Sequence, residues 1–120
     1  MADLTDVKKV SEITKEHIAE YLHLAEPTAN EFKELNMFLE VAKSYIKSYT
    51  GQKDLDKYQD FIIAVFILCQ DMYDNRALYI EKGSINNTVS TILDMHSVNL
   101  IWSMQVNIIK KLKLYLLLME

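Results

Sequence analysis

Glycine and proline are scarce in this sequence, whose 120 residues include two glycines and one proline. Tight hairpins, phosphate-binding loops and the corners of β-sandwiches depend on these residues, because glycine adopts positive φ angles and proline presets a turn. The sequence therefore has little material for an all-β fold or for a glycine-rich nucleotide site. We expect a mainly helical domain with few, short turns.

Cysteine is nearly absent as well, since Cys69 is the only one. A single cysteine excludes an intrachain disulfide and a cysteine-based zinc site, and it suits a reducing compartment. The first ten residues lack the apolar stretch and cleavage pattern of a secretory leader. The longest uncharged run, residues 95–109, contains polar residues and is shorter than a bilayer span, so we predict no transmembrane segment and no membrane partner.

The charge balance is acidic, at −4 with a pI of about 5.3. Residues 1–101 hold 10 basic and 16 acidic side chains, while residues 102–120 hold three lysines and one glutamate. The body is therefore acidic (−6) and the tail basic (+2). Clustered basic residues are needed to bind phosphates, so this balance argues against a general nucleic-acid binder.

The hydrophobic pattern predicts an all-α fold: a small bundle of about four helices with an irregular loop after the third and an extended C-terminal tail. Half of the residues are hydrophobic and a quarter are charged, as in folded domains, and the length suits one domain. We divide the chain into an N-terminal arm (1–13), either loosely held or a short helix, a helical domain (14–101) and a C-terminal extension (102–120).

Helix boundaries are predicted from capping residues. Thr14 caps the first helix, which Pro27 prevents from continuing, and Thr28 with Glu31 forms a capping box for the second, which ends at Gly51. We expect a third helix from Asp54 or Asp56, with Arg76 compensating Asp71 and Asp74 at its end. A loop or a short hairpin over 77–87 follows, and then a short helix capped by Asn87 or Thr88.

Two segments are unusually apolar. Residues 61–69 are hydrophobic on every side of a helix, which predicts burial inside the domain or between copies. The tail is ambiguous, because residues 98–108 alternate as in a strand, while residues 101–116 also contain a helical stripe flanked by three lysines.

Candidate chemical groups do not assemble into a catalytic pattern. His17 and His23 are six residues apart, which is not the spacing of helical metal ligands, and His96 near Asp94 has no nucleophile motif beside it. Cys69 lies in the most apolar stretch, where a thiol is a small core residue. The aspartates at 54–60 do not fit a calcium loop. We predict a protein that is not an enzyme and has no metal or other cofactor.

Three segments follow one another in an informative order: AKSYIKSYTG (42–51), MYDNR (72–76) and HSVNLI (96–101). Together with the helical stretch from Thr14, they resemble the small helical head–tail connector proteins of tailed bacteriophages, the adaptor family also described as head-completion or DNA-packaging proteins. The resemblance covers about residues 14–101. The segment WSMQVNIIKKLKLYLLLME, which follows, lies beyond it.

The resemblance implies a virion protein at the head–tail interface, assembled in the bacterial cytoplasm as a ring of about a dozen copies under the portal protein. Such a ring extends the DNA channel, lets DNA pass without sequence-specific binding, and docks the next connector or stopper protein. An acidic body suits this role, because it repels phosphate. The extension 102–120 is a candidate portal-binding segment.

The resemblance also assigns candidate site residues. Portal contacts are expected at His96, Ser97, Val98, Asn99, Leu100, Ile101 and Trp102, and a loop facing the ring or channel at Tyr79, Glu81, Lys82 and Gly83. A ring subunit buries surface against its neighbours, so packing between subunits is expected at Phe61, Ile62, Val65 and Phe66. The alternative function is a small helical regulatory or antitoxin-like protein that forms homodimers through residues 61–69.

Overall fold

The structure, a computed structural model of the chain, describes residues 6–76, 85–98, 109 and 111–118. Within these ranges the chain is mostly helical and contains no strand, which confirms the predicted all-α class. The elements are η2 (Val10–Glu12), α1 (Lys15–Tyr21), α2 (Ala29–Thr50), η3 (Leu55–Lys57), α3 (Phe61–Asn75) and α4 (Asn87–Met95), and residues 111–118 are also helical.

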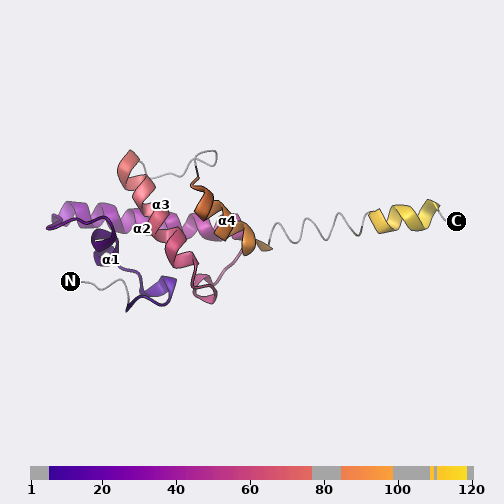
Figure 1. Cartoon of the computed structure of the whole chain (residues 1–120), viewed down its shortest axis with the longest axis horizontal. Helices are drawn as coiled ribbons and strands as arrows, with labels where there is room; N and C mark the ends of the chain where they lie inside the picture. The colour runs from indigo at the N-terminus through magenta and orange to yellow at the C-terminus, as the bar shows by residue number, and fades with distance from the viewer. Residues whose placement is uncertain (1–5, 77–84, 99–108, 110, 119–120) are drawn as a thin grey trace.

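The long helix α2 forms the back of the body, and α3 crosses in front of it with α1 and α4 on either side (Figure 1). Together these helices enclose one core of buried apolar residues. Helical residues 111–118 lie away from this body, at the far end of the molecule's longest dimension of 72 Å (Figure 1). The ambiguous tail is thus helical over 111–118, and the alternating segment lies outside the described residues from residue 99 to its end at residue 108.

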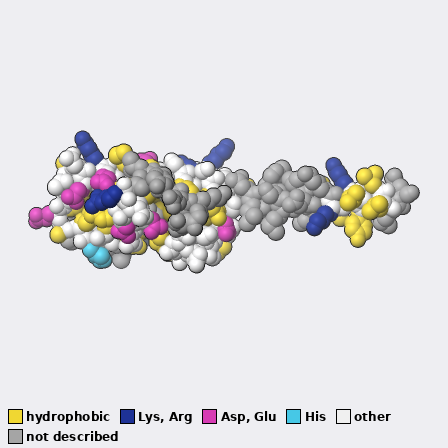
Figure 2. Space-filling model, turned by 90° about the horizontal axis from the view of Figure 1, so that it is seen from above, with side chains coloured by type: hydrophobic (Ala, Val, Ile, Leu, Met, Phe, Trp, Pro, Cys, Tyr) yellow, Lys and Arg dark blue, Asp and Glu magenta, His cyan; other side chains and the backbone are white. Residues whose placement is uncertain are grey.

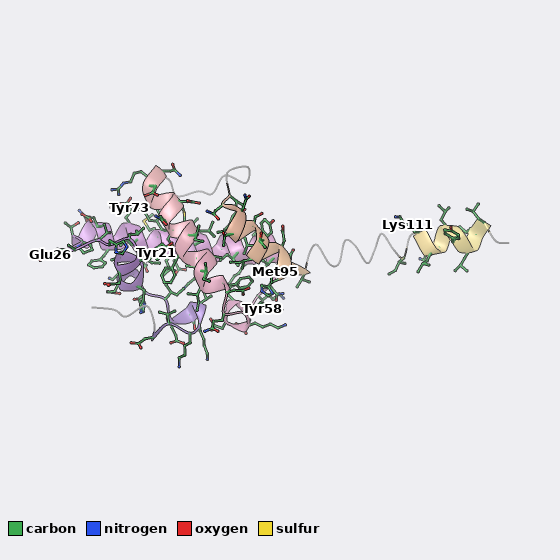
Figure 3. All side chains as sticks on the ribbon, viewed as in Figure 1. Tyr21, Glu26, Tyr58, Tyr73, Met95 and Lys111 are labelled. Carbon is green, nitrogen blue, oxygen red and sulfur yellow. The ribbon has the colours of Figure 1, made fainter. Side chains whose placement is uncertain are left out.

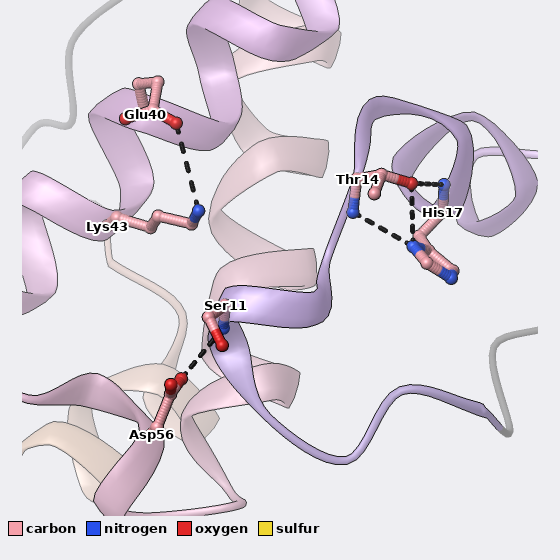
Figure 4. Close-up of polar contacts among 6 residues, drawn as sticks. All are labelled: Ser11, Thr14, His17, Glu40, Lys43 and Asp56. Atoms are coloured by element: carbon pink, nitrogen blue, oxygen red, sulfur yellow. Dashed lines mark hydrogen bonds and ion pairs between the residues drawn. The ribbon is translucent and has the colours of Figure 1, made fainter.

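Of the two predictions for residues 1–13, a loosely held arm or a short helix, the described part of the N-terminal segment favours the second, since it contains the short helix η2. Val7, Val10 and Ile13 are buried in the core, and burying side chains of this size contributes about 1.5–3 kcal/mol each. The backbone amide of Ser11 also donates to Asp56 Oδ1 at 2.8 Å (Figure 4). Residues 7–13 are therefore part of the helical body.

Helix α1 begins where the sequence predicts. The Thr14 hydroxyl accepts from the His17 amide, and His17 Nδ1 accepts from the Thr14 amide at 3.0 Å, so His17 completes a capping box (Figure 4). The helix ends earlier than Pro27 requires. His23 adopts φ 59°, and the Leu24 amide donates to the Ala19 carbonyl, which closes the helix.

Helix α2 has both predicted ends. The Thr28 hydroxyl accepts from the Glu31 amide at 3.2 Å, and Gly51 adopts φ 75°, a left-handed conformation that favours glycine. Buried residues recur at three- and four-residue spacing along one face: Leu35, Phe38, Leu39, Ala42, Ile46 and Thr50. This face packs against α3, α1 and α4.

The predicted start of the third helix is wrong. Asp54 instead caps the short turn η3, where its carboxylate accepts from the Asp56 amide at 3.1 Å, and α3 begins only at Phe61. The predicted cap of α4 is one or two residues late, because Asn86 Oδ1 accepts from the Thr88 amide at 2.8 Å. Both errors concern neighbouring residues that are equally able to cap a helix.

The assignment of Phe61, Ile62, Val65 and Phe66 to packing between subunits is also wrong. All four are buried in the chain's own core, because α3 is packed against α1, α2 and α4. They have almost no surface to offer a neighbour. In the apolar stretch 61–69 the clear exception is Ile63, whose side chain is 51% exposed.

Arg76 does not compensate Asp71 and Asp74 as predicted. Its guanidinium lies over the Tyr73 ring, 4.3 Å from the centroid, and Nη1 contacts Glu34 Oε1 on α2 at 3.1 Å. Arg76 adopts φ 52° at the end of α3, so its side chain turns back toward α2. The end of α3 is thus tied to α2, while its two aspartates have no ion pair with any described residue.

Candidate functional site at the end of α4

The end of α4 is held by an aromatic clamp around His96, the residue that follows the helix. The imidazole stacks on the Tyr58 ring with centroids 3.8 Å apart, and its edge meets Phe61 at 5.3 Å and 89°. Figure 3 shows Tyr58 close to Met95 at this end of the body. We call Tyr58, Asp60, Phe61 and His96 the His96 clamp.

Polar contacts add to this stacking. His96 Nε2 lies 2.8 Å from Asp60 Oδ2, in the turn that leads into α3. The His96 carbonyl accepts from Gln52 Nε2 at 3.0 Å, just beyond the end of α2. Both the ring and the backbone of His96 are therefore fixed by segments distant in sequence.

A second bond joins α4 to α2 one turn earlier. The Tyr49 hydroxyl donates to Asp94 Oδ1 at 2.5 Å, and this hydrogen bond raises the pKa of Tyr49 above its usual value, with burial adding to the shift. The carboxylate beside His96 in sequence thus has a different partner. The structure does not bring His96 and Asp94 together as an acid–base pair.

Sequence reasoning missed Asp60, Tyr58 and Gln52 as partners of His96. Asp60 and His96 are 36 residues apart, and Gln52 and His96 are 44 apart. No local spacing or motif connects them. The only available signal was the helical face that His96 shares with Val89 and Ile92, which places the ring toward the core.

The clamp leaves an exposed apolar edge. Met95 and Val98 are 64% and 45% exposed, whereas Ser97 between them is buried. Of the seven predicted portal-contacting residues, His96 and Ser97 are mostly covered and Val98 offers surface. Residues 99–102 lie outside the described residues, as do the four predicted loop residues at 79–83.

Cys69 is buried in the core. Burial raises the pKa of the Cys69 thiol to about 12, so the thiolate needed for nucleophilic attack is strongly disfavoured. Within the described ranges, acidic, histidine and cysteine side chains form no group of three able to hold a metal ion. The same residues include no helix with the length and apolar character that crossing a membrane requires.

One hollow of about 390 Å³ lies between the start of α1 and the outer side of α2. Its apolar floor includes Ile13, Phe32 and Leu39, and its rim carries three lysines. Lys43 on this rim lies 3.9 Å from Glu40 (Figure 4), and Lys15 lies over the Phe32 ring. The hollow is open, and two of its three lysines, Lys15 and Lys43, are engaged within the chain.

Comparisons of the chain with protein-family models, with curated proteins and with solved structures found no match.

Proposed function

We propose that this chain is a structural head–tail connector of a phage or prophage virion. It forms a ring under the portal, extends the DNA channel and docks the next connector or stopper protein. The proposal comes from the resemblance of residues 42–51, 72–76 and 96–101, in this order, to the adaptor family. No catalytic step is assigned to any residue, and the chain acts by assembly.

The position of these three segments supports the proposal. Residues 42–51 form the second half of α2 with its glycine end, residues 72–76 end α3, and residues 96–98 follow α4. The end of α2 and the end of α4 are also linked in space, because Tyr49 bonds to Asp94, two residues before the third segment, and Gln52, one residue after the first segment, bonds to the His96 carbonyl. The resembling segments thus lie at helix ends, and two of these ends, those of α2 and α4, are held together.

The His96 clamp is the observation that carries the proposal. A portal-contacting segment has to leave the body at a fixed point and direction, since a rigid start reduces the entropy lost on binding. The clamp fixes residue 96 through its ring and its backbone, and it leaves Met95 and Val98 exposed beside the exit. These two side chains provide apolar contact for a portal surface.

Attachment to the portal tests this function. The chain is mixed with the portal protein of the same phage or prophage, and complexes are imaged by negative-stain electron microscopy. A ring of density on the portal is expected. A stable dimer that ignores the portal would refute the connector and favour a small homodimeric regulatory protein.

A matched pair of variants locates the contact. Val98→Asp places a charge on the exposed edge and is expected to weaken portal attachment at least tenfold, because a charge is then desolvated in an apolar contact. Met37→Asp makes the same change at a 49% exposed site on α2 and should leave attachment unchanged. Equal effects of the two variants would rule out a portal surface at Val98.

A further inference from the structure

Helical residues 111–118 carry an unusually exposed apolar surface. Six of the eight side chains are apolar and are 59–77% exposed: Leu112, Leu114, Tyr115, Leu116, Leu117 and Leu118. A helix that is apolar on nearly all sides is stable only when it is buried, and a helix of this length gains little from its own hydrogen bonds. Figure 2 shows this apolar cluster beside lysines at the end of the molecule.

The charge of this segment narrows the choice of partner. Lys111 and Lys113 are two residues apart, so they project from nearly opposite sides of a helix. Whichever side docks, a lysine lies close to the edge of the contact. A partner surface that combines apolar and acidic side chains therefore fits better than one that is purely apolar.

The outer face of α3 has this combination. Asp60, Ile63, Ile67, Asp71 and Asp74 follow one another at spacings of three or four residues, which places them on one side of the helix. Ile63 and Asp74 are exposed, and Asp60, Ile67 and Asp71 are partly exposed, so this side of α3 is not covered by the described helices. We call these five residues the α3 outer face.

The acidic end of this face is electrostatically unfavourable as it stands. The pKa of Asp71 is raised mainly by burial and further by the charge of Asp74, and neither carboxylate has an ion pair among the described residues. Ile63, about two turns before Asp71 on the same side of the helix, is half exposed. A lysine-bearing apolar helix would cover the isoleucines and relieve this repulsion at the same time.

We propose that residues 111–118 of one copy dock on the α3 outer face of a neighbouring copy. The acidic body and the basic tail of this chain attract each other between copies, and residues 111–118 lie well away from their own body (Figure 1). Because the two surfaces differ, the contact is head-to-tail and repeats from copy to copy, as a closed ring requires. The biological role of this contact rests on the proposed connector function, because the contact would hold neighbouring copies together in the connector ring.

Charge-reversal complementation tests this contact with the full chain. One variant carries Lys111→Glu and Lys113→Glu, so its tail and its α3 outer face are both acidic. The other carries Asp71→Lys and Asp74→Lys, so both surfaces are basic. Each variant alone is expected to associate at least tenfold more weakly than wild type in analytical ultracentrifugation, and an equimolar mixture should recover association.

The recovery is specific to a contact between copies, because each tail in the mixture meets a face of opposite charge only on the other variant. A control with Glu16→Lys and Glu26→Lys changes the charge equally at exposed sites outside α3 and should associate as wild type does. Circular dichroism verifies that each variant is folded. A monomeric wild type, or a mixture no more associated than its components, overturns the proposal, as does a tail that docks on its own body.

The experiment needs no portal, so its failure is distinct from failure of the connector function. A wild-type chain that attaches to the portal but does not associate with itself would overturn the docking proposal alone. Recovery of association in the mixture supports docking, whatever the portal result is.

Discussion

The His96 clamp is expected to contribute about 2 kcal/mol to the free energy of unfolding. An aromatic stack such as His96 on Tyr58 contributes about 0.5–1.5 kcal/mol, and the edge contact with Phe61 adds buried area. The bond to Asp60 adds about 0.5–1 kcal/mol, since the two side chains are 17% and 34% exposed and solvent weakens their interaction. His96→Ala removes all of these terms.

Urea unfolding of the full chain measures this loss. With an m-value of about 1.5 kcal/mol/M, a loss of 2 kcal/mol lowers the midpoint by roughly 1.3 M. His96→Phe keeps a ring in the stack and loses only the bond to Asp60, so its midpoint should fall by less than half as much. The Gln52 bond to the His96 carbonyl persists in both variants, because it involves the backbone.

Gln59→Ala is the matched control for the clamp, because it truncates the exposed side chain next to Asp60 and should change stability by less than about 0.5 kcal/mol. A double-mutant cycle of His96→Ala with Asp60→Asn then isolates the polar term. If His96→Ala destabilises no more than Gln59→Ala, the ring does not hold the end of α4, and the proposed exit point loses its support.

Three further variants test other parts of the structure. Phe61→Ala should lower the free energy of unfolding by about 3–5 kcal/mol in urea unfolding of the dilute chain. An unchanged midpoint would instead indicate that Phe61 packs between copies. His23→Gly should raise stability by roughly 0.5–1 kcal/mol in a thermal melt, because His23 adopts φ 59°, and a lower melting temperature would contradict that conformation. The Ser11 amide lowers the pKa of Asp56, so the bond between them stabilises the fold above the unfolded pKa of this carboxyl, and this stabilisation is lost as pH falls through the lower folded pKa. Asp56→Asn should therefore lose less stability than wild type between pH 7 and pH 3. An unchanged pH profile would exclude this bond.

Local signals explain which helix ends the sequence predicted. Thr14, Thr28 and Gly51 act through bonds to residues at most four positions away, so their roles can be inferred from neighbouring letters. Asp54 and Asp56 gave an equally local signal, but it belongs to the turn η3 and not to α3. Local chemistry identifies a cap without identifying which helix or turn it caps.

Long-range contacts explain what the sequence could not reveal. Ser11 bonds to Asp56, 45 residues away in sequence. This bond and the burial of Val10 attach the charged N-terminal segment to the helical body. Arg76 likewise bonds to Glu34, 42 residues away, and not to Asp74, which is nearer in sequence. Each partner is selected by the packing of helices, which no spacing along the chain records.

The two apolar stretches show why hydrophobicity alone does not locate a surface for neighbours. Residues 61–69 and 112–118 have similar composition, but α3 is packed against three helices, while the second stretch is exposed. What distinguishes them in sequence is the flanking charge: lysines adjoin the exposed stretch, and aspartates follow the isoleucines on the outer side of α3. A contact between copies therefore has to be sought where apolar and charged residues alternate on one exposed face, and there the tail and α3 have opposite signs.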